Sequence, residues 1–329
     1  MPKRIYVKIK GRFFMPINDK KIKIILTGAT GVIGAGIVRQ CIKTGWEVCA
    51  AVRPDSPKNK YIAGLGATII HCDLKDISNL AENVECQNAD YFIHLGWMGT
   101  KKAERENRSV QQKNVEYAIK ACEVAAQIGC KAFVFAGSQA EYGRLEGVMK
   151  PDLPTNPESE YGKAKLEAGS KTKEICARYG MRHIYTRILS VYGPCNEPDT
   201  MVMSTISKIS KGEEPKFTPG EQLWDYMYSD DAARALLLLA QFGKDNQIYC
   251  IGSGEFKPLK DYIRMIGNVV NPKIALGIGE IPYSANQIMK LCADIDLLKQ
   301  DTGFKPEISF EEGIRLTMEW MIQNDMLGE

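Results

Sequence analysis

The strongest constraint on the fold is a glycine-rich turn close to the start of the chain. A β-branched apolar run at 22–27 leads into the turn, and 32–44 then carries apolar side chains at helical spacing. This order is typical of a buried strand that turns into a helix. Gly28 permits a tight bend, Gly31 allows the backbone to approach a pyrophosphate, and Gly34 allows close packing of helix on strand. Because a helix N-terminus attracts phosphate, the turn predicts a dinucleotide site with contacts from Gly28, Thr30, Gly31, Val32, Ile33 and Gly34.

Short apolar runs and amphipathic stretches alternate through the first half of the chain. Strands are predicted at 47–52, 67–71, 90–95, 132–137 and 183–189. Helices are predicted near 75–82, 103–128 and 158–180. Alternating strands and helices form parallel βαβ units. The pattern predicts an α/β fold, a Rossmann-type doubly wound parallel sheet that binds ligands at the carboxyl ends of its strands.

The alternation loosens after about residue 190, where prolines and glycines cluster between helical stretches. Helices are predicted near 200–211, 230–242, 258–270 and 310–324. We expect a smaller mixed α/β lobe here that binds the substrate. The predicted division is a basic N-terminal extension at 1–20, a dinucleotide-binding domain at 21–190 that segments near 223–251 rejoin, and a substrate lobe at 191–329.

The first 23 positions hold a local excess of positive charge. Ile5, Val7 and Ile9 alternate with polar residues, so the stretch lacks the apolar run of a secretory signal. Three interpretations are open: an extra strand, a disordered basic arm, or non-native sequence that precedes a true start at Met15.

Composition excludes several classes of protein. With 43 basic and 40 acidic residues among 329, the net charge of +3 gives no general attraction to nucleic acid or membrane. The 10 cysteines are scattered without C-x-x-C pairs, which argues against a disulfide scaffold and a zinc site. No stretch approaches the roughly 20 apolar residues of a membrane span. A reducing cytoplasm and no metal are expected.

The ends of the second and third strands bear on the choice of cofactor. The second strand ends at Arg53 without the acid that usually holds the adenosine ribose. A guanidinium matches a 2′-phosphate, which favours NADP slightly over NAD. The alternative is that Arg53 is a solvent-exposed charge in a loop and does not bind the cofactor. Asp73, followed by Leu74, is the expected acceptor for the adenine amino group, and the backbone of Leu95 and Gly96 is expected to line the cofactor after the fourth strand.

Three residues in a fixed order point to proton transfer. Tyr161 and Lys165 lie four residues apart at the start of a predicted helix, so they share one face. A nearby ammonium favours the phenolate, which makes the tyrosine a general base. Ser138 follows the fifth predicted strand and is expected to hold the substrate oxygen against Tyr161. Glu141 alternates with Tyr142 and is therefore expected to point away from this site.

The three histidines of the chain lie in apolar strand contexts, where a structural role is expected. They are His71, His94 and His183. Trp224, Tyr226 and Tyr228 recur at period two, as on a strand face, and Trp224 is also a candidate for stacking on a nucleobase.

Together these motifs resemble the extended short-chain dehydrogenase/reductase family, which includes nucleotide-sugar epimerases, reductases and dehydratases. The resemblance covers roughly residues 22–325 and rests on the segments 27–34, 138–143, 161–165, 187–194, 225–232 and 249–254. It implies that Asn114 supports the cofactor region, that Val191 faces the nicotinamide and that Ser190 faces the sugar. It also implies a homodimer through the helices near 103–128 and 158–180.

Departures from the family pattern narrow the expected chemistry. The 4,6-dehydratases carry an Asp-Glu pair where this chain has Gln139 and Ala140, so dehydration is not expected. The arginine that grips the substrate diphosphate in 4-epimerases is Trp224 here, and none appears near 282–286. The sequence around Trp224 and 282–286 resembles the CDP-abequose and CDP-tyvelose branch of the family more than it resembles the 4-epimerases. Lys208, Lys211 or Lys216 are candidates for the missing charge.

The resemblance therefore implies an NAD(P)-dependent 4-epimerase or 4-ketoreductase of a nucleotide-linked sugar. The expected substrate contacts are Gln139, Ser190 and Trp224. Two alternatives remain: a reductase or dehydrogenase of a small non-nucleotide carbonyl, and a non-catalytic protein that senses NADP.

Overall fold

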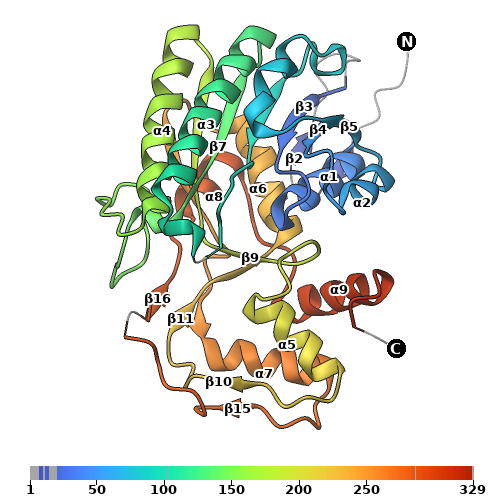
Figure 1. The fold of residues 1–329 in the computed structure, drawn as a ribbon, viewed down its shortest axis with the longest axis vertical. Coiled ribbons are helices and arrows are strands. Elements are labelled where there is room, and N and C mark those ends of the chain that lie inside the picture. The colour runs from blue at the N-terminus through green and yellow to red at the C-terminus, as the bar shows by residue number, and fades with distance from the viewer. Residues whose placement is uncertain (1–6, 10–11, 15–20, 102, 286, 328–329) are drawn as a thin grey trace.

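A seven-stranded parallel sheet forms the centre of the larger part of the molecule (Figure 1). The computed structural model describes residues 7–9, 12–14, 21–101, 103–285 and 287–327. The strand order is β13-β8-β7-β6-β3-β4-β5. The strands are β3 (Lys23–Thr27), β4 (Glu47–Val52), β5 (Thr68–His71), β6 (Tyr91–His94), β7 (Ala132–Ser138), β8 (Arg182–Ile188) and β13 (Gln247–Ile251). The order reverses between β3 and β6, which opens a crevice at their carboxyl ends.

Helices cover both faces of the sheet. One face carries α1 (Val32–Thr44), α2 (Asn59–Gly64), α6 (Ser229–Phe242) and α8 (Asp296–Thr302), and the other carries α3 (Arg108–Ile128) and α4 (Glu160–Tyr179). The side chains of β3 explain the two cores, because Ile24 and Leu26 pack on one face while Ile25 packs on the other. The predicted Rossmann-type α/β fold is confirmed.

Two helical predictions need correction. The stretch 103–128 was expected to be one helix, but α3 begins at Arg108 because the Asn107 side chain accepts the N–H of Val110 at 3.2 Å. Residues before this cap form a separate 3-10 turn, η3 (Glu104–Glu106). The predicted helix at 75–82 is a 3-10 helix, η1 (Leu74–Ala81), with Asp73 as its cap.

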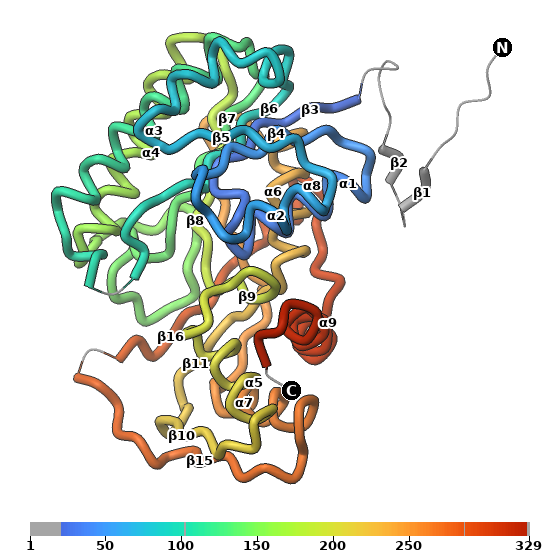
Figure 2. The backbone as a smooth tube through the Cα atoms, turned by 45° about the vertical axis from the view of Figure 1, so that its right-hand side comes forward, coloured from blue at the N-terminus to red at the C-terminus, as the bar shows by residue number. Residues whose placement is uncertain are grey.

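Several segments between β8 and the C-terminus build a second, smaller lobe below the sheet (Figure 2). Its strands form three small sheets, β12-β9, β14-β11-β16 and β10-β15. Its elements are β9 (Ser190–Tyr192), α5 (Met201–Ser210), β10 (Lys216–Phe217), β11 (Leu223–Trp224), β12 (Tyr226–Tyr228), β14 (Lys257–Pro258), α7 (Leu259–Val270), β15 (Gly277–Ile278), β16 (Lys290–Leu291) and α9 (Phe310–Gln323).

Aromatic side chains form the centre of this lobe. The ring of Tyr226 lies 5.9 Å from that of Tyr192, 5.2 Å from that of Tyr262 and 5.6 Å from that of Phe310. Between β12 and β13 the chain returns to the sheet, where α6 packs on α1 through an ion pair of Asp230 with Arg39.

Most of the predicted N-terminal extension lies outside the described residues. Within it, β1 (Val7–Ile9) pairs antiparallel with β2 (Arg12–Phe14). Among the described helices, none combines the length and apolar composition needed to cross a membrane.

Candidate active site

The glycine turn joins β3 to α1 at the crevice of the sheet. Gly28 has a φ of 75°, and a Cβ on Gly34 would lie 2.2 Å from the Gly28 carbonyl oxygen, so both positions exclude larger residues. A Cβ on Gly31 would meet only that oxygen, at 3.5 Å. The first turn of α1 has neither a side-chain cap nor an acidic residue. Its unpaired N–H groups therefore fit a phosphate group.

The ends of neighbouring strands close around this turn. A Cβ on Gly28 would lie 2.9 Å from the nitrogen of Gly96, and one on Gly96 would lie 2.8 Å from Leu74 Cδ2. Thr27 Oγ1 accepts the N–H of Gly96 at 3.0 Å and lies 2.9 Å from His94 Nδ1. Burial, with a smaller contribution from the positive charge of Lys165, lowers the pKa of His94 to about 3. His94 is thus a neutral structural residue.

A cavity of about 320 Å³ opens beside the ends of β4 and β5. Asp55, His71 and Asp73 contribute to its lining. One carboxylate oxygen of Asp73 accepts the N–H of Lys75 at 3.1 Å. Arg53 follows β4 directly and is exposed to solvent. The structure thus brings Asp73 and Leu74 to the predicted cofactor region, whereas Arg53 is an exposed side chain that does not line the cavity.

Tyr161, Ser138 and Lys165 meet where β7 ends and α4 begins. Burial raises the pKa of Tyr161, while the nearby Ser138 side chain and the positive charge of Arg105 oppose that shift. Lys165 Nζ lies 5.8 Å from the centre of the Tyr161 ring and donates to the Ala136 carbonyl oxygen at 2.7 Å. Burial lowers the pKa of Lys165 to about 7, although the charge of Glu141 opposes this.

Two further residues contact this group, and the sequence did not identify either as functional. The Trp97 ring centre lies 3.8 Å from Lys165 Nζ, and the rings of Trp97 and Tyr161 meet edge-on at 6.1 Å. The Arg105 guanidinium lies 4.3 Å from the Tyr161 ring centre. Trp97 directly follows Leu95 and Gly96, whose backbone was expected to line the cofactor, and Arg105 fell inside a predicted helix. No periodicity links either position to Tyr161.

Polar side chains of α3 hold the loop that carries Trp97 and Arg105. Asn114 Oδ1 accepts the N–H of Met98 at 2.8 Å, and Asn114 Nδ2 donates to the Met98 carbonyl oxygen at 2.9 Å. Gln111 accepts the Trp97 indole N–H at 2.8 Å and donates to the Gly99 carbonyl oxygen at 2.9 Å. Asn114 therefore acts on the site through this loop.

Glu141 does not point away from Ser138, as its alternation with Tyr142 predicted. It is fully buried, and its Oε1 accepts the N–H of Ser138 at 2.7 Å. Its Oε2 accepts the Tyr185 hydroxyl at 2.8 Å and Arg187 Nε at 2.9 Å. The physical reason is a capping box, in which the turn after β7, η4 (Gln139–Glu141), folds the carboxylate back onto Ser138. Burial raises the pKa of Glu141, and Arg187 opposes the shift.

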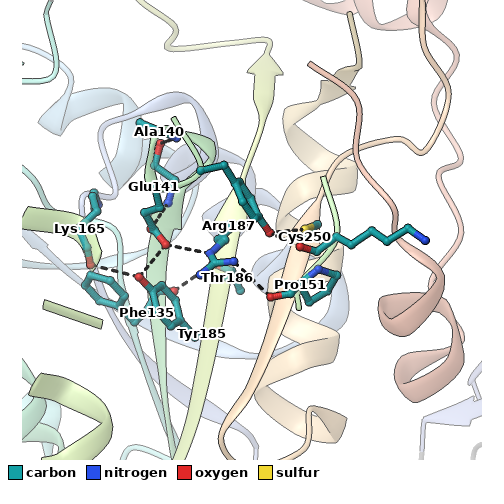
Figure 3. Close-up of polar contacts among 12 residues, drawn as sticks. Phe135, Ala140, Glu141, Pro151, Lys165, Tyr185, Thr186, Arg187 and Cys250 are labelled. Carbon is teal, nitrogen blue, oxygen red and sulfur yellow. Dashed lines mark hydrogen bonds and ion pairs between the residues drawn. The ribbon is translucent and has the colours of Figure 1, made fainter. Parts of the chain in front are cut away.

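Tyr185 connects the buried Glu141 carboxylate to the backbone of α4. Its hydroxyl oxygen lies 3.2 Å from the Lys165 carbonyl oxygen of α4 as well as 2.8 Å from Glu141 (Figure 3). One buried cluster thus fixes both the turn that carries Ser138 and the helix that carries Lys165.

The lobe brings two of the three expected substrate residues, Ser190 and Trp224, together at β9. The Trp224 indole N–H donates to Ser190 Oγ at 2.8 Å. Gln139 is half-buried at the start of η4. Of the lysines considered for a diphosphate, Lys216 is paired with Glu280 at 3.1 Å, whereas Lys208 and Lys211 are exposed at the end of α5. Within the described residues, no group of three or more His, Cys, Asp or Glu side chains is arranged to hold a metal.

Comparison with known proteins identifies relatives of this chain. A putative UDP-glucose 4-epimerase of Methanocaldococcus jannaschii is 27% identical over 92% of this chain and 99% of its own. A dTDP-glucose 4,6-dehydratase of Shigella flexneri is 29% identical over 92% of this chain and 93% of its own.

Solved structures show the same fold. The UDP-glucose 4-epimerase of Thermotoga maritima, solved with UDP-glucose, superposes with a TM-score of 0.81 at 24% identity, over 92% of this chain and 99% of its own. The protein MoeE5, solved with UDP-glucuronic acid and NAD, gives 0.79 at 25% identity over the same shares. Residues 24–252 match the NAD dependent epimerase/dehydratase family. The chain is therefore an enzyme that belongs to the NAD-dependent epimerase/dehydratase family.

Proposed function

We propose that the protein is a 4-epimerase or 4-ketoreductase of a nucleotide-linked sugar, with Tyr161 as its general acid and base. The observation that carries the proposal is the cluster of Ser138, Tyr161 and Lys165 beside the glycine turn. Several relatives with this fold are named as enzymes of UDP- and dTDP-sugars, which supports this class of substrate.

The dinucleotide would be held by chain segments that meet at the crevice. The first turn of α1 would bind the pyrophosphate, and Asp73 the adenine. Lys165 would bind the nicotinamide ribose, with Val191 against the nicotinamide. When bound, the nicotinamide supplies a hydride acceptor and donor. Arg53, exposed directly after β4, favours the 2′-phosphate of NADP, and we propose this preference on charge alone.

Tyr161 would take the proton of the C4 hydroxyl and return it. The Ser138 hydroxyl, which also accepts the N–H of Ala140 at 3.2 Å, would hold the substrate oxygen against the phenol. Gln139, Ser190 and Trp224 would contact the sugar and its nucleotide. Elimination of water needs a second acid–base pair, and neither Gln139 nor Ala140 can transfer a proton at neutral pH.

Replacement of Tyr161 by Phe tests this mechanism. Turnover of nucleotide sugars should fall by roughly 100- to 10,000-fold, which is the usual contribution of a general acid or base. Dinucleotide affinity, measured by calorimetry, should stay within about twofold because the ring remains. Tyr179, exposed at the end of the same helix, provides the matched control as Tyr179→Phe. Turnover retained in Tyr161→Phe would overturn the mechanism.

The dinucleotide that purifies with the protein separates the two reactions. An epimerase regenerates its cofactor within each turnover and retains it, whereas a reductase exchanges it. Mass spectrometry of denatured protein should therefore detect stoichiometric dinucleotide for an epimerase. The same spectrum distinguishes NADP from NAD.

A reductase of a small carbonyl is the second candidate. Two observations favour it. Trp224 occupies the position where a diphosphate-binding arginine was expected, and its indole N–H donates to Ser190. Lys216, a candidate for the missing charge, is paired with Glu280. Thermal shift with CDP-, UDP- and dTDP-sugars separates the candidates. Stabilisation by one of these ligands supports the first, and none with any nucleotide supports the second.

We also propose how the molecule is organised. Residues 21–190, with the segments that return to the sheet, would bind the dinucleotide, and 191–329 would bind the substrate. Two chains would associate through α3 and α4. All 10 cysteines are free thiols, which favours a reducing cytoplasm.

A further inference from the structure

Arg105 contacts the proposed base directly. Its guanidinium carbon lies 4.3 Å from the centre of the Tyr161 ring, which is within the range of a cation–π interaction. The side chain is half-buried. Its neighbour Arg108 lies 4.0 Å from Glu160, whereas Arg105 forms no ion pair in the part of the chain that the structure describes. The aromatic ring is therefore its main partner.

Lys165 is a weaker source of positive charge at this site than its spacing from Tyr161 implies. Its ammonium is directed to the Ala136 carbonyl oxygen and to the face of Trp97. Burial lowers the pKa of Lys165 to about 7, so its positive charge is less favoured at neutral pH than that of an exposed lysine. A guanidinium, in contrast, stays charged at every pH at which the protein is folded.

We propose that Arg105 is a positioning residue that stabilises the phenolate of Tyr161, as a permanent charge that works beside Lys165. The proposal rests on the proposed role of Tyr161 as the base. The phenolate form carries negative charge on the ring and oxygen, so a cation against the ring favours it over the neutral phenol.

Other charged groups near Tyr161 act in both directions. The Ser138 side chain, at the end of β7, favours ionisation of the phenol, and the buried Glu141 carboxylate opposes it. At the start of α4, Glu160 is already engaged with Lys163 at 2.7 Å and faces Arg108. On the element that carries Arg105, Glu106 approaches the N–H of Glu160 at 3.4 Å. Arg105 is thus the cation on η3 that reaches the ring.

Direct titration of the tyrosine tests the proposal. The protein would be labelled with [ζ-¹³C]tyrosine and saturated with oxidised NADP, and the Tyr161 signal would be assigned from its absence in Tyr161→Phe. We expect Arg105→Gln to raise the pKa of this phenol by about one pH unit, in line with loss of a charge within about 4–6 Å. Arg105→Lys, which keeps a positive charge at this position, should return the pKa most of the way to its wild-type value.

Arg108→Gln is the matched control, because it removes the same charge from an exposed neighbour that does not contact the ring. The control should titrate like the wild type. An unchanged Tyr161 titration in Arg105→Gln, or an equal shift in Arg108→Gln, would overturn the proposal. Because the signal reports the phenol itself, the test gives a result whether or not any sugar is turned over. In an active enzyme the acid limb of the kcat/KM profile should move by the same amount.

Discussion

At the scale of single residues, buried ionisable groups dominate the proposed site. Glu141, Lys165 and Arg187 are exposed by 0, 4 and 3% respectively. A charge in such surroundings is unfavourable unless it is paired and hydrogen-bonded. Glu141 and Arg187 meet this condition through each other, whereas Lys165 relies on a carbonyl oxygen and an indole face. The two situations lead to different predictions.

Replacement of Glu141 by Gln should destabilise the protein. The substitution leaves the Arg187 guanidinium buried without a countercharge, and breaking a buried pair in this way lowers the free energy of unfolding by roughly 3 kcal/mol. Urea unfolding measures the loss. Glu312→Gln removes one partner of an exposed pair with Arg315, in which the side chains are 47 and 54% exposed, and should change the free energy by less than about 1 kcal/mol. Equal effects of the two variants would contradict this account of the cluster.

Lys165 predicts a pH dependence of stability. Its folded pKa of about 7 lies below the ordinary 10.5, so between these values the unfolded chain holds a proton that the native protein lacks. The free energy of unfolding, relative to that of Lys165→Met, should therefore rise with pH from about 7 to 10.5. The slope should be at most about 1.4 kcal/mol per pH unit. Denaturant titrations of dinucleotide-free protein at several pH values measure it. A flat or falling difference would refute the assignment.

Only part of the site could be predicted from the sequence. Ser138, Tyr161 and Lys165 stand at strand and helix ends in an order that carries meaning without a structure. Arg105 and Trp97 reach Tyr161 only because α3 holds their loop, and that contact leaves no pattern along the chain.

At the scale of elements, six of the seven strands of the sheet were predicted to within about two residues because their apolar runs are short and sharply bounded. The seventh, β13, was not predicted as a strand, although segments near 223–251 were expected to rejoin this domain. The helices α2 and α8 were missed, since six and seven residues are too few to establish a helical period. The start of α3 depended on the hydrogen bond of one capping side chain, at Asn107.

The turn between β3 and α1 allows two glycines to be compared. Gly31→Ala should weaken dinucleotide binding at least tenfold while leaving the melting temperature nearly unchanged, because its methyl group would occupy the space where phosphate approaches the backbone. Gly34→Ala should lower the melting temperature as well, since its Cβ would lie 2.2 Å from the Gly28 oxygen and 2.6 Å from Ala29 Cα. Calorimetric titration and thermal unfolding separate the effects. Equal loss of stability in both variants would argue against a phosphate site at Gly31.

At the scale of the whole molecule, α3 and α4 lie side by side on one face of the sheet (Figure 1). If this face joins two chains, light scattering should give twice the 36.7 kDa of one chain. Tyr117 and Leu166 are half-buried side chains on these helices. The substitutions Tyr117→Lys and Leu166→Lys should reduce the mass to that of one chain. Tyr179→Lys, at an exposed end of α4, is the control and should not. A wild-type mass of one chain would exclude the dimer.

The return of the chain to the sheet has a consequence for biosynthesis. The seventh strand, β13, and the helix α6 that covers α1 are made only after part of the second lobe has left the ribosome. Until then the apolar surface of α1 and the sheet that Ala232, Ala233 and Leu236 later cover stays exposed. Exposed apolar surface of this kind makes partly synthesised chains prone to aggregation. The rate at which residues 190–251 are translated, and the availability of chaperones during that interval, should therefore affect the yield of folded protein. We expect a larger effect there than from the translation rate near the start or end of the chain.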